Sequence, residues 1–277
     1  MIGFVTDSNA QLPAELVERY AVEVVPLTVT IDGTPYLEGV DIDADAFYER
    51  FESGQPEVST SQPSPGLFTQ AYERAAARGV DEILSVHIGS AVSGTINAAR
   101  LAAQTAPWKV RLVDTGTASF GVACCLWEAA EAVAAGASLE EAAEVAEQVG
   151  STVANIFIVK ALDLARAGGR LSPDARVGDA IPVLRLVQGV IETVGEARDL
   201  DEAVEVMGSF VQSWGTALRV GVGAADAGTE PLGEALASRL AAADEVLEVV
   251  RYRIGPSVGV HTGPGTAGAC YYPAGNR

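Results

Sequence analysis

The sequence predicts an α/β fold, and three features support this class. Short β-branched segments alternate with amphipathic helical segments through the first half of the chain, which is typical of a parallel sheet. A similar alternation starts again after residue 152, so we expect a second domain there. At 277 residues, the chain is long enough for two modest domains.

The elements of the first domain follow from hydrophobic periodicity and from helix start and stop residues. We expect a buried strand at 2–6 and then a helix at 13–20, whose apolar residues share one side. The β-rich segment 22–31 ends at Asp32-Gly33, a hairpin turn signal, so residues 34–40 can return antiparallel. The other expected elements are helices at 43–51, 64–79, 97–104, 120–135 and 139–149, and strands at 83–88 and 110–114.

The second half repeats these signals. The expected elements are a strand at 153–159, a short helix ending at Gly168-Gly169, a β-rich segment at 183–194, helices near 199–214 and 231–243, and strands near 220 and at 246–254. The segment 255–265 is rich in glycine and proline, and we expect it to form a shaped loop near a ligand or partner rather than regular structure.

The charge balance excludes several classes of partner. Lys and Arg number 18 and Asp and Glu 37, which gives a net charge of −19 that repels nucleic-acid backbones and does not indicate membrane-surface binding. No apolar run approaches the roughly 18 residues of a spanning helix. The start lacks a signal-peptide pattern and the chain has only three cysteines, so we expect a cytoplasmic protein without disulfides.

Two loops carry hydroxyl groups suited to binding an anion. Residues 60–64 (TSQPS) precede a helix start, where free N–H groups and the helix dipole favour negative charge; Ser64 as a simple N-cap is the alternative interpretation. Residues 89–95 (GSAVSGT) leave the carboxyl end of a strand, where α/β sheets bind ligands. This loop lacks the lysine of a nucleotide triphosphate cradle, so it suits a phosphate or a carboxylate.

The remaining motifs do not indicate a metal site, a nucleophile elbow or a calcium loop. The two histidines, His87 and His261, are too few for a typical metal site, and we expect no metal or cofactor. Ser257 matches a nucleophile-elbow pattern, but we reject it because glycine and proline follow where a helix is needed and no acidic residue comes later. The acidic residues at 41–52 resemble a calcium loop that lacks its glycine, and they fit a helix start better.

Taken together and in order, these loops resemble the DegV family of bacterial fatty-acid-binding proteins. The resemblance covers nearly the whole chain. It is carried by residues 5–8 (VTDS), 60–64 (TSQPS), 92–95 (VSGT) with 97–99 (NAA), 168–172 (GGRLS) and 261–265 (HTGPG). One departure is Gly89, which stands where many relatives have serine.

The resemblance implies a DegV-like fold of two domains. Residues 1–152 would form an N-terminal, mostly parallel, three-layer α/β domain, and residues 153–277 a C-terminal α+β domain with a mixed sheet. One long-chain fatty acid, such as palmitate, would lie in an apolar tunnel with its carboxylate near the interdomain cleft.

The resemblance also implies a carrier rather than an enzyme. A separate, ATP-binding fatty acid kinase subunit would convert the presented carboxylate to an acyl phosphate. Carried over by position, Thr60 and Ser93 would bind the carboxylate with His261 close by. Ser61 and Thr95 would be neighbours of second rank, and Arg170 would serve the head group or the kinase interface.

Two other function classes stay open at this point. The first is an acyl hydrolase or acyltransferase that uses Ser93 with His261; Asp7 is then the obvious candidate for the third group. The second is a sensor of a small anion or nucleotide, in which Ser90, Ser93 and Gly94 hold a phosphate. Retained lipid would favour the carrier, ester hydrolysis the enzyme, and a thermal shift with nucleotides the sensor.

Overall fold

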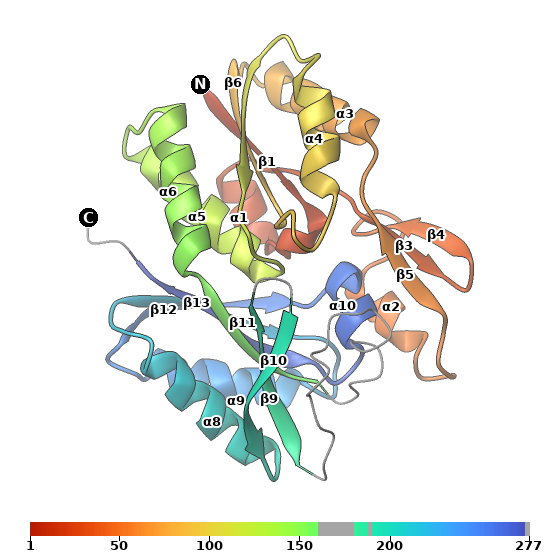
Figure 1. The fold of residues 1–277 in the computed structure, drawn as a ribbon, viewed down its shortest axis with the longest axis vertical. Coiled ribbons are helices and arrows are strands. Elements are labelled where there is room, and N and C mark those ends of the chain that lie inside the picture. Colours follow the sequence, from red (N-terminus) through yellow and green to blue (C-terminus); the bar gives the residue numbers. More distant parts are fainter. Residues whose placement is uncertain (160–179, 188–189, 275–277) are drawn as a thin grey trace. The chain divides into compact units, whose positions relative to one another are not determined.

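The computed structural model describes residues 1–159, 180–187 and 190–274 (Figure 1). The chain divides into two compact units. The first unit consists of Met1–Asp41 and Glu57–Thr152, and the second of Ile42–Pro56 and Val153–Arg277. We describe each unit by itself.

The first unit contains a parallel four-stranded sheet with the order β2-β1-β6-β7. Its strands are β1 (Ile2–Asp7), β2 (Glu23–Val25), β6 (Glu82–His87) and β7 (Lys109–Asp114). The central strands β1 and β6 are buried along almost their whole length, since helices cover both faces. The register pairs Thr6 with Val86 and His87 with Asp114, so the carboxyl ends of β1, β6 and β7 meet at one edge.

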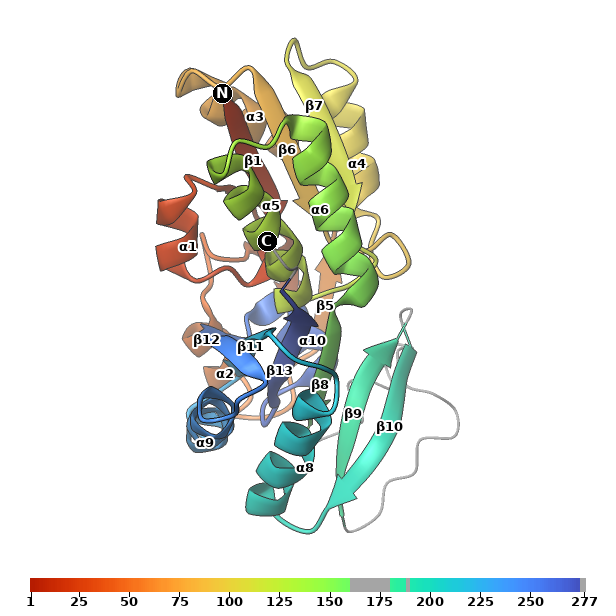
Figure 2. The ribbon, with the colours of Figure 1, turned by 90° about the vertical axis from the view of Figure 1, so that its left-hand side faces the viewer.

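Helices on both faces of this sheet make the first unit a three-layer structure (Figure 2). Helices α3 (Pro65–Ala77) and α4 (Thr95–Ala103) cover one face, and their inward residues share a core with Val5 and Ile83. Helices α5 (Phe120–Ala134) and α6 (Leu139–Thr152) pack on the other face. The short elements η1 (Ser8–Ala10) and α1 (Ala14–Arg19) lie between β1 and β2 in the chain.

A small antiparallel sheet, of order β4-β3-β5, accompanies the parallel one. Its strands are β3 (Thr28–Ile31), β4 (Thr34–Leu37) and β5 (Val58–Ser61). The strand predicted at 22–31 is therefore two strands, β2 and β3, separated at Pro26-Leu27; proline has no N–H to donate to a ladder. Thr60 and Ser61, expected in a loop, end strand β5, where Thr60 pairs with Val29.

The second unit contains a six-stranded mixed sheet with the order β10-β9-β8-β13-β11-β12. Only the β11–β12 pair is parallel among the described pairs of this sheet. The strands are β8 (Ala154–Ile158), β9 (Ile181–Val187), β10 (Val190–Ala197), β11 (Leu218–Ala224), β12 (Val246–Arg253) and β13 (Ala267–Pro273). The predicted α/β class, with one parallel and one mixed sheet, is confirmed.

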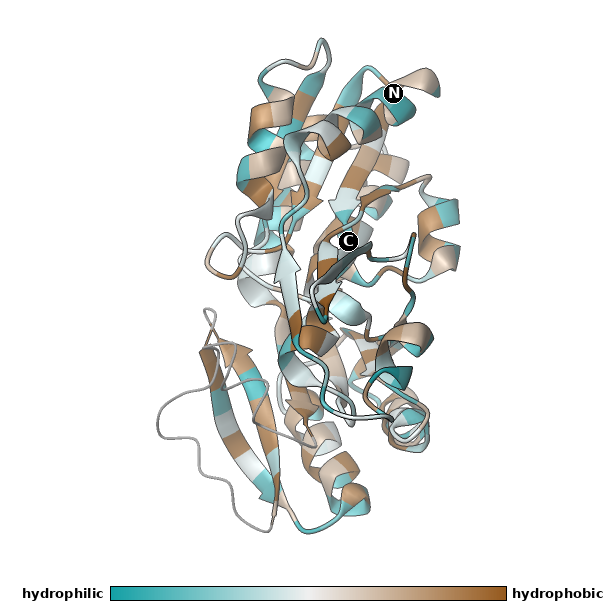
Figure 3. Ribbon diagram, turned by 90° about the vertical axis from the view of Figure 1, so that its right-hand side faces the viewer, coloured by the Kyte–Doolittle hydropathy of each residue, from teal (hydrophilic) through white to brown (hydrophobic). Residues whose placement is uncertain are grey.

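Two helices, α8 (Leu200–Gln212) and α9 (Glu230–Ala241), pack on one face of the mixed sheet. Their inward residues, such as Met207 and Leu236, are completely buried against strand residues that include Val220 and Tyr271. Figure 3 shows both hydrophobic and polar residues along the antiparallel strands β9 and β10.

The segment 255–265 departs from the prediction, because residues Pro256–Thr262 form helix α10. Pro256 occupies the first turn, where its missing N–H costs nothing. Gly259 serves packing rather than a turn: a Cβ at this position would lie 2.6 Å from the ring of Phe47 and 2.6 Å from the hydroxyl oxygen of Tyr48. Both aromatic residues belong to helix α2 (Ala44–Glu49).

The contact between α2 and α10 explains why Ile42–Pro56 belong to the second unit. Arg253 of β12 reinforces it, with hydrogen-bonded ion pairs to Asp45 of α2 and to Glu230 of α9. The sequence-based division at residue 152 placed 42–56 in the first domain, whereas the compact units group this segment with Val153–Arg277.

Candidate functional site

The carboxyl ends of β1 and β6 form a topological switch point. From β1 the chain passes to β2 on one side of the sheet, and from β6 it passes to β7 on the other side. In open α/β sheets, ligands bind outside the carboxyl ends of the strands at such a point. Asp7 ends β1 and His87 ends β6, so these two residues mark the candidate site.

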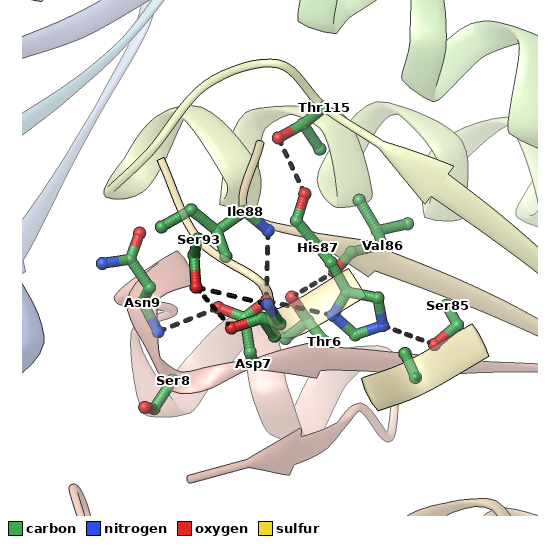
Figure 4. Close-up of polar contacts among 12 residues, drawn as sticks. Thr6, Asp7, Ser8, Asn9, Ser85, Val86, His87, Ile88, Ser93 and Thr115 are labelled. Atoms are coloured by element: carbon green, nitrogen blue, oxygen red, sulfur yellow. Dashed lines mark hydrogen bonds and ion pairs between the residues drawn. The ribbon is translucent and has the colours of Figure 1, made fainter. Parts of the chain in front are cut away.

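The Asp7 carboxylate is completely buried and accepts three hydrogen bonds (Figure 4). Its Oδ2 atom accepts from His87 Nδ1 at 3.0 Å and from the backbone N–H of Ile88 at 3.1 Å. Its Oδ1 atom accepts from the backbone N–H of Asn9 at 3.2 Å. A buried carboxylate is tolerated only when it is well paired, and these donors supply that pairing.

The hydrogen bonds of His87 continue into the core. Its Nε2 atom lies 2.6 Å from Ser85 Oγ, which lies 3.0 Å from the hydroxyl of Tyr72. Because the carboxylate accepts, the proton of a neutral His87 resides on Nδ1, and Nε2 accepts from Ser85. Burial raises the pKa of Tyr72 to about 12, with the Ser85 hydrogen bond opposing the rise, so its hydroxyl keeps its proton.

The order Asp7, His87, Ser85 repeats the bonding order of a hydrolase triad. Ser85, however, is fully buried and lies within hydrogen-bond distance of Tyr72, and the Phe68 and His87 rings form a T-shaped pair with 5.1 Å between their centroids. A nucleophile must reach substrate, so this arrangement is structural rather than catalytic. It also shows that Asp7, the third group considered for a Ser93–His261 hydrolase, orients His87.

The loop from Ile88 to Gly94 follows β6 and carries the hydroxyl groups of Ser90 and Ser93. The backbone N–H groups of Val92 and Ser93 both donate to the Gly89 carbonyl, which makes a tight turn. Ser93 Oγ lies 2.8 Å from Thr95 Oγ1 and accepts from the Thr95 backbone N–H at 3.3 Å. Ser93 is half-buried and Thr95 is buried, so Ser93 is the more accessible hydroxyl of the pair.

A second loop, residues 115–119, holds the first loop from the β7 side. Gly89 donates its N–H to the Thr117 carbonyl at 2.8 Å. A Cβ on Gly89 would lie 2.7–2.9 Å from backbone atoms of Gly116 and Thr117, so this close approach requires glycine. The structure thus accounts for glycine at the position where many relatives are expected to have serine.

Asp114 and Asn9 complete the connections between these loops. Asp114 Oδ1 accepts from the backbone N–H groups of Ser90 and Gly116 at 3.0 and 3.2 Å. Burial alone would raise the pKa of Asp114, but hydrogen bonds from Ser90 and Gly116, with the charge of Arg100, lower it. Asn9 Oδ1 accepts from the backbone N–H of Ser119 at 2.8 Å. The loops after β1, β6 and β7 therefore form one hydrogen-bonded ring.

The loop after β5 adjoins this ring. A Cβ on Gly94 would overlap Oε1 of Gln62, so the Gln62 side chain lies directly against the Ser93–Gly94–Thr95 turn. Thr60, two residues earlier, is half-buried, and Ser61 is exposed. Both hydroxyl-bearing segments predicted from the sequence thus reach the same region of the first unit.

Comparison with known proteins agrees with this architecture. The family model described as "Uncharacterised protein, DegV family" matches residues 1–274. The chain belongs to the DegV family. A DegV domain-containing protein of Streptomyces coelicolor is 34% identical over 274 residues, which is 96% of each chain.

Solved DegV structures match almost the whole chain. A DegV family protein from Thermus thermophilus, described by its fatty acid binding, has a TM-score of 0.89 and 33% identity, with 99% of each chain covered. DegV of Bacillus subtilis, described as a fatty acid binding protein, has a TM-score of 0.85 and 26% identity, again with 99% of each chain covered. Fatty acid binding is therefore a documented property of relatives of this DegV chain.

His261 belongs to the second unit, where it lies half-buried in the last turn of α10. The segment after it is held by Asp226, whose Oδ2 accepts from the Gly265 N–H at 2.6 Å. Asp226 Oδ1 accepts from the Thr229 N–H at 3.0 Å, near the start of α9. Arg170 lies outside the described residues.

The Asp7–His87 pair was not predicted from the sequence: His87 served only to argue against a metal site, and Asp7 was considered only as a third group for Ser93 and His261. The signal that could have revealed the pair is positional: each residue ends a buried strand, and neighbouring parallel strands bring their carboxyl ends together. In the described part of the chain, no group of three His, Cys, Asp or Glu residues is placed to hold a metal ion. No described helix has the length and apolar character needed to span a bilayer.

Proposed function

We propose that this DegV-family protein binds one long-chain fatty acid and presents its carboxylate to a separate ATP-dependent kinase subunit, which forms an acyl phosphate. The observation that carries the proposal is the accessible Ser93 hydroxyl on a hydrogen-bonded loop at the switch point of the parallel sheet. The fatty-acid-binding relatives from Thermus thermophilus and Bacillus subtilis support the choice of ligand.

The chemistry of the site suits a carboxylate that is to be phosphorylated. Neutral hydroxyls such as those of Ser93 and Thr60 hold a carboxylate by charge-assisted hydrogen bonds. A hydroxyl that donates to the carboxylate draws less electron density from the attacking oxygen than a cation bound directly to it would. Ser61 and Thr95 are proposed as supporting neighbours. The family resemblance adds His261 close to the carboxylate and assigns Arg170 to the head-group region or to the kinase interface.

The acyl tail would supply most of the affinity. Burial of apolar surface is worth about 0.8 kcal/mol per CH₂, so a sixteen-carbon chain gains on the order of 10 kcal/mol before ordering costs. The hydroxyls would then set the orientation of the carboxylate and contribute the smaller part of the binding free energy. The protein would act as a carrier, and turnover would need the kinase subunit and ATP.

Mass spectrometry of an organic extract of the purified protein tests the ligand. The expected result is one long-chain fatty acid per protein molecule in the extract. The mass of this fatty acid should equal the difference between the protein masses measured under native and denaturing conditions. An empty extract, combined with no thermal shift on adding palmitate, would contradict the proposal.

A coupled assay tests the kinase step. Palmitoyl phosphate should form only when this protein, ATP and a fatty acid kinase subunit are all present. Formation by this protein and ATP alone would contradict the carrier role.

A further inference from the structure

We propose that Asp7 and His87 are the positioning residues of the head-group site. Together they set the backbone of the loop from Ile88 to Gly94, called the Ser93 loop below, without touching the ligand. This inference rests on the proposed function, because it concerns the same site. It starts from the three hydrogen bonds that the Asp7 carboxylate accepts.

One carboxylate controls the start of two loops. Oδ2 holds the N–H of Ile88, the residue at which the chain leaves β6 and enters the Ser93 loop. Oδ1 holds the N–H of Asn9, whose side chain in turn accepts from Ser119 in the loop after β7. Movement of Asp7 would therefore be transmitted to all three loops at the switch point.

Both oxygens of the Asp7 side chain are needed as acceptors, because all three of its partners donate. An asparagine at this position would offer one acceptor oxygen, and its NH₂ group would face an N–H that needs an acceptor. A buried donor left without a partner is costly, so the loop backbone would move to relieve the mismatch. His87, which has no exposed surface, supplies one of these donors from within the core.

His87 is itself held in one orientation from the far side. Ser85 Oγ contacts Nε2, and the Tyr72 hydroxyl contacts Ser85 and lies 3.4 Å from the Ala99 carbonyl oxygen of α4. These contacts keep the His87 ring in the core. The loop backbone itself is held at its start by the hydrogen bond from the Ile88 N–H to Asp7, which needs Asp7 and its His87 donor but not Tyr72.

Two substitutions of one residue separate positioning from general stability. His87→Asn places an amide near the position of Nδ1, where it can still donate to Asp7, but it loses the contact with Ser85. His87→Gln places its amide near the position of Nε2, where it can contact Ser85, but it leaves Asp7 without this donor. Both variants replace the ring with a smaller amide, so both should lower the thermal midpoint.

The experiment measures palmitate affinity and hydrogen exchange of the peptide that contains residues 88–95. We expect Asp7→Asn and His87→Gln to weaken palmitate binding at least about tenfold, or about 1.4 kcal/mol. Both variants should also speed hydrogen exchange of this peptide about tenfold or more. Lowering the free energy of local opening by about 1.4 kcal/mol raises the population of the open, exchange-competent state about tenfold. His87→Asn and the control Tyr72→Phe should stay within about threefold of the wild type in both readouts.

The outcomes distinguish the inference from the proposed function. If His87→Gln and His87→Asn bind palmitate equally well and exchange equally fast, Asp7 and His87 do not position the loop, and the inference is overturned. If the wild type binds no palmitate, the proposed function fails. The exchange difference between the two His87 variants then still decides whether the pair sets the loop.

Discussion

Asp226 Oδ2 accepts the backbone N–H of Gly265 at 2.6 Å, and this hydrogen bond ties the carboxyl end of β11 to the segment that follows His261. The arrangement parallels the one in the first unit, where Asp7 at the end of β1 accepts the N–H of Ile88. In each unit an aspartate just at or beyond the end of a parallel strand holds the backbone of a segment that the family resemblance assigns to the head group.

Replacing Asp226 by alanine should destabilise the protein by about 1–3 kcal/mol, because the buried N–H of Thr229 and that of Gly265 lose their acceptor. Urea unfolding measures the loss, and Asp244→Ala, at an exposed position, is the control. If His261 binds the head group, palmitate affinity should fall as well. A variant as stable as the control would show that this hydrogen bond does not hold the segment.

Ser93→Ala and Thr60→Ala should each weaken palmitate binding by about 1–3 kcal/mol if their hydroxyls donate to the carboxylate. Isothermal titration with palmitate measures the effect. Ser59→Ala is a matched control, since Ser59 precedes Thr60 on β5, is exposed, and points to the other side of the strand. Unchanged affinity in both variants would remove these residues from the site.

Gly89→Ala should destabilise the first unit by about 1–3 kcal/mol, because the new methyl group would collide with the backbone of Gly116 and Thr117. Thermal and urea unfolding provide the measurement. Gly66→Ala is the control: its Cβ would meet only Ser64 Oγ, at 3.8 Å, and alanine favours the helix there. Equal stability of the two variants would contradict the close approach of the loops.

The hydrogen bonds that Asp114 accepts from the Ser90 and Gly116 N–H groups should weaken at acidic pH. The pKa of Asp114 is lowered in the folded protein, so its stabilising contribution is complete above the unfolded value near 3.9 and is lost as pH falls through the lower folded value. The stability difference between wild type and Asp114→Asn, from urea unfolding, should therefore be constant from pH 5 to 7 and shrink below about pH 4. A difference that grows on acidification would mean that the sign is wrong.

The sequence predicted the parallel sheet well because short apolar runs bounded by turn residues are typical of strands that are buried on both faces. Residues 2–6 and 83–88 are apolar runs, and the structure buries them between two helical layers as β1 and β6. Thr60 is expected in a loop because it stands shortly before the proline-rich start of the next helix, but its pairing with Val29 across the small sheet makes it part of strand β5. The strand propensity of Thr60 does not by itself predict this contact.

Helix α10 and the Asp7–His87 pair were missed for a common reason. Gly259 weakens a helix by its own propensity, yet it is required where Phe47 and Tyr48 lie against the helix backbone. Likewise, nothing local to Asp7 or His87 indicates the partner 80 residues away. Both features depend on contacts between segments that are distant in sequence, which the local residue pattern does not report; for Asp7 and His87, only the pairing of their two strands brings them together.

The grouping of Ile42–Pro56 with Val153–Arg277 has a consequence for biosynthesis. Asp45 leaves the ribosome 208 residues before Arg253, its ion-pair partner. Until α10 and β12 are made, the apolar side of α2, with Phe47 and Tyr48, lacks its native cover, so it is a candidate for chaperone contact or misassociation during synthesis. The second unit can therefore complete its folding only after its last strands are made, because it depends on contacts between residues far apart in the chain. Removing residues 42–56 should impair the folding of this unit, even though they lie far upstream of the rest of it.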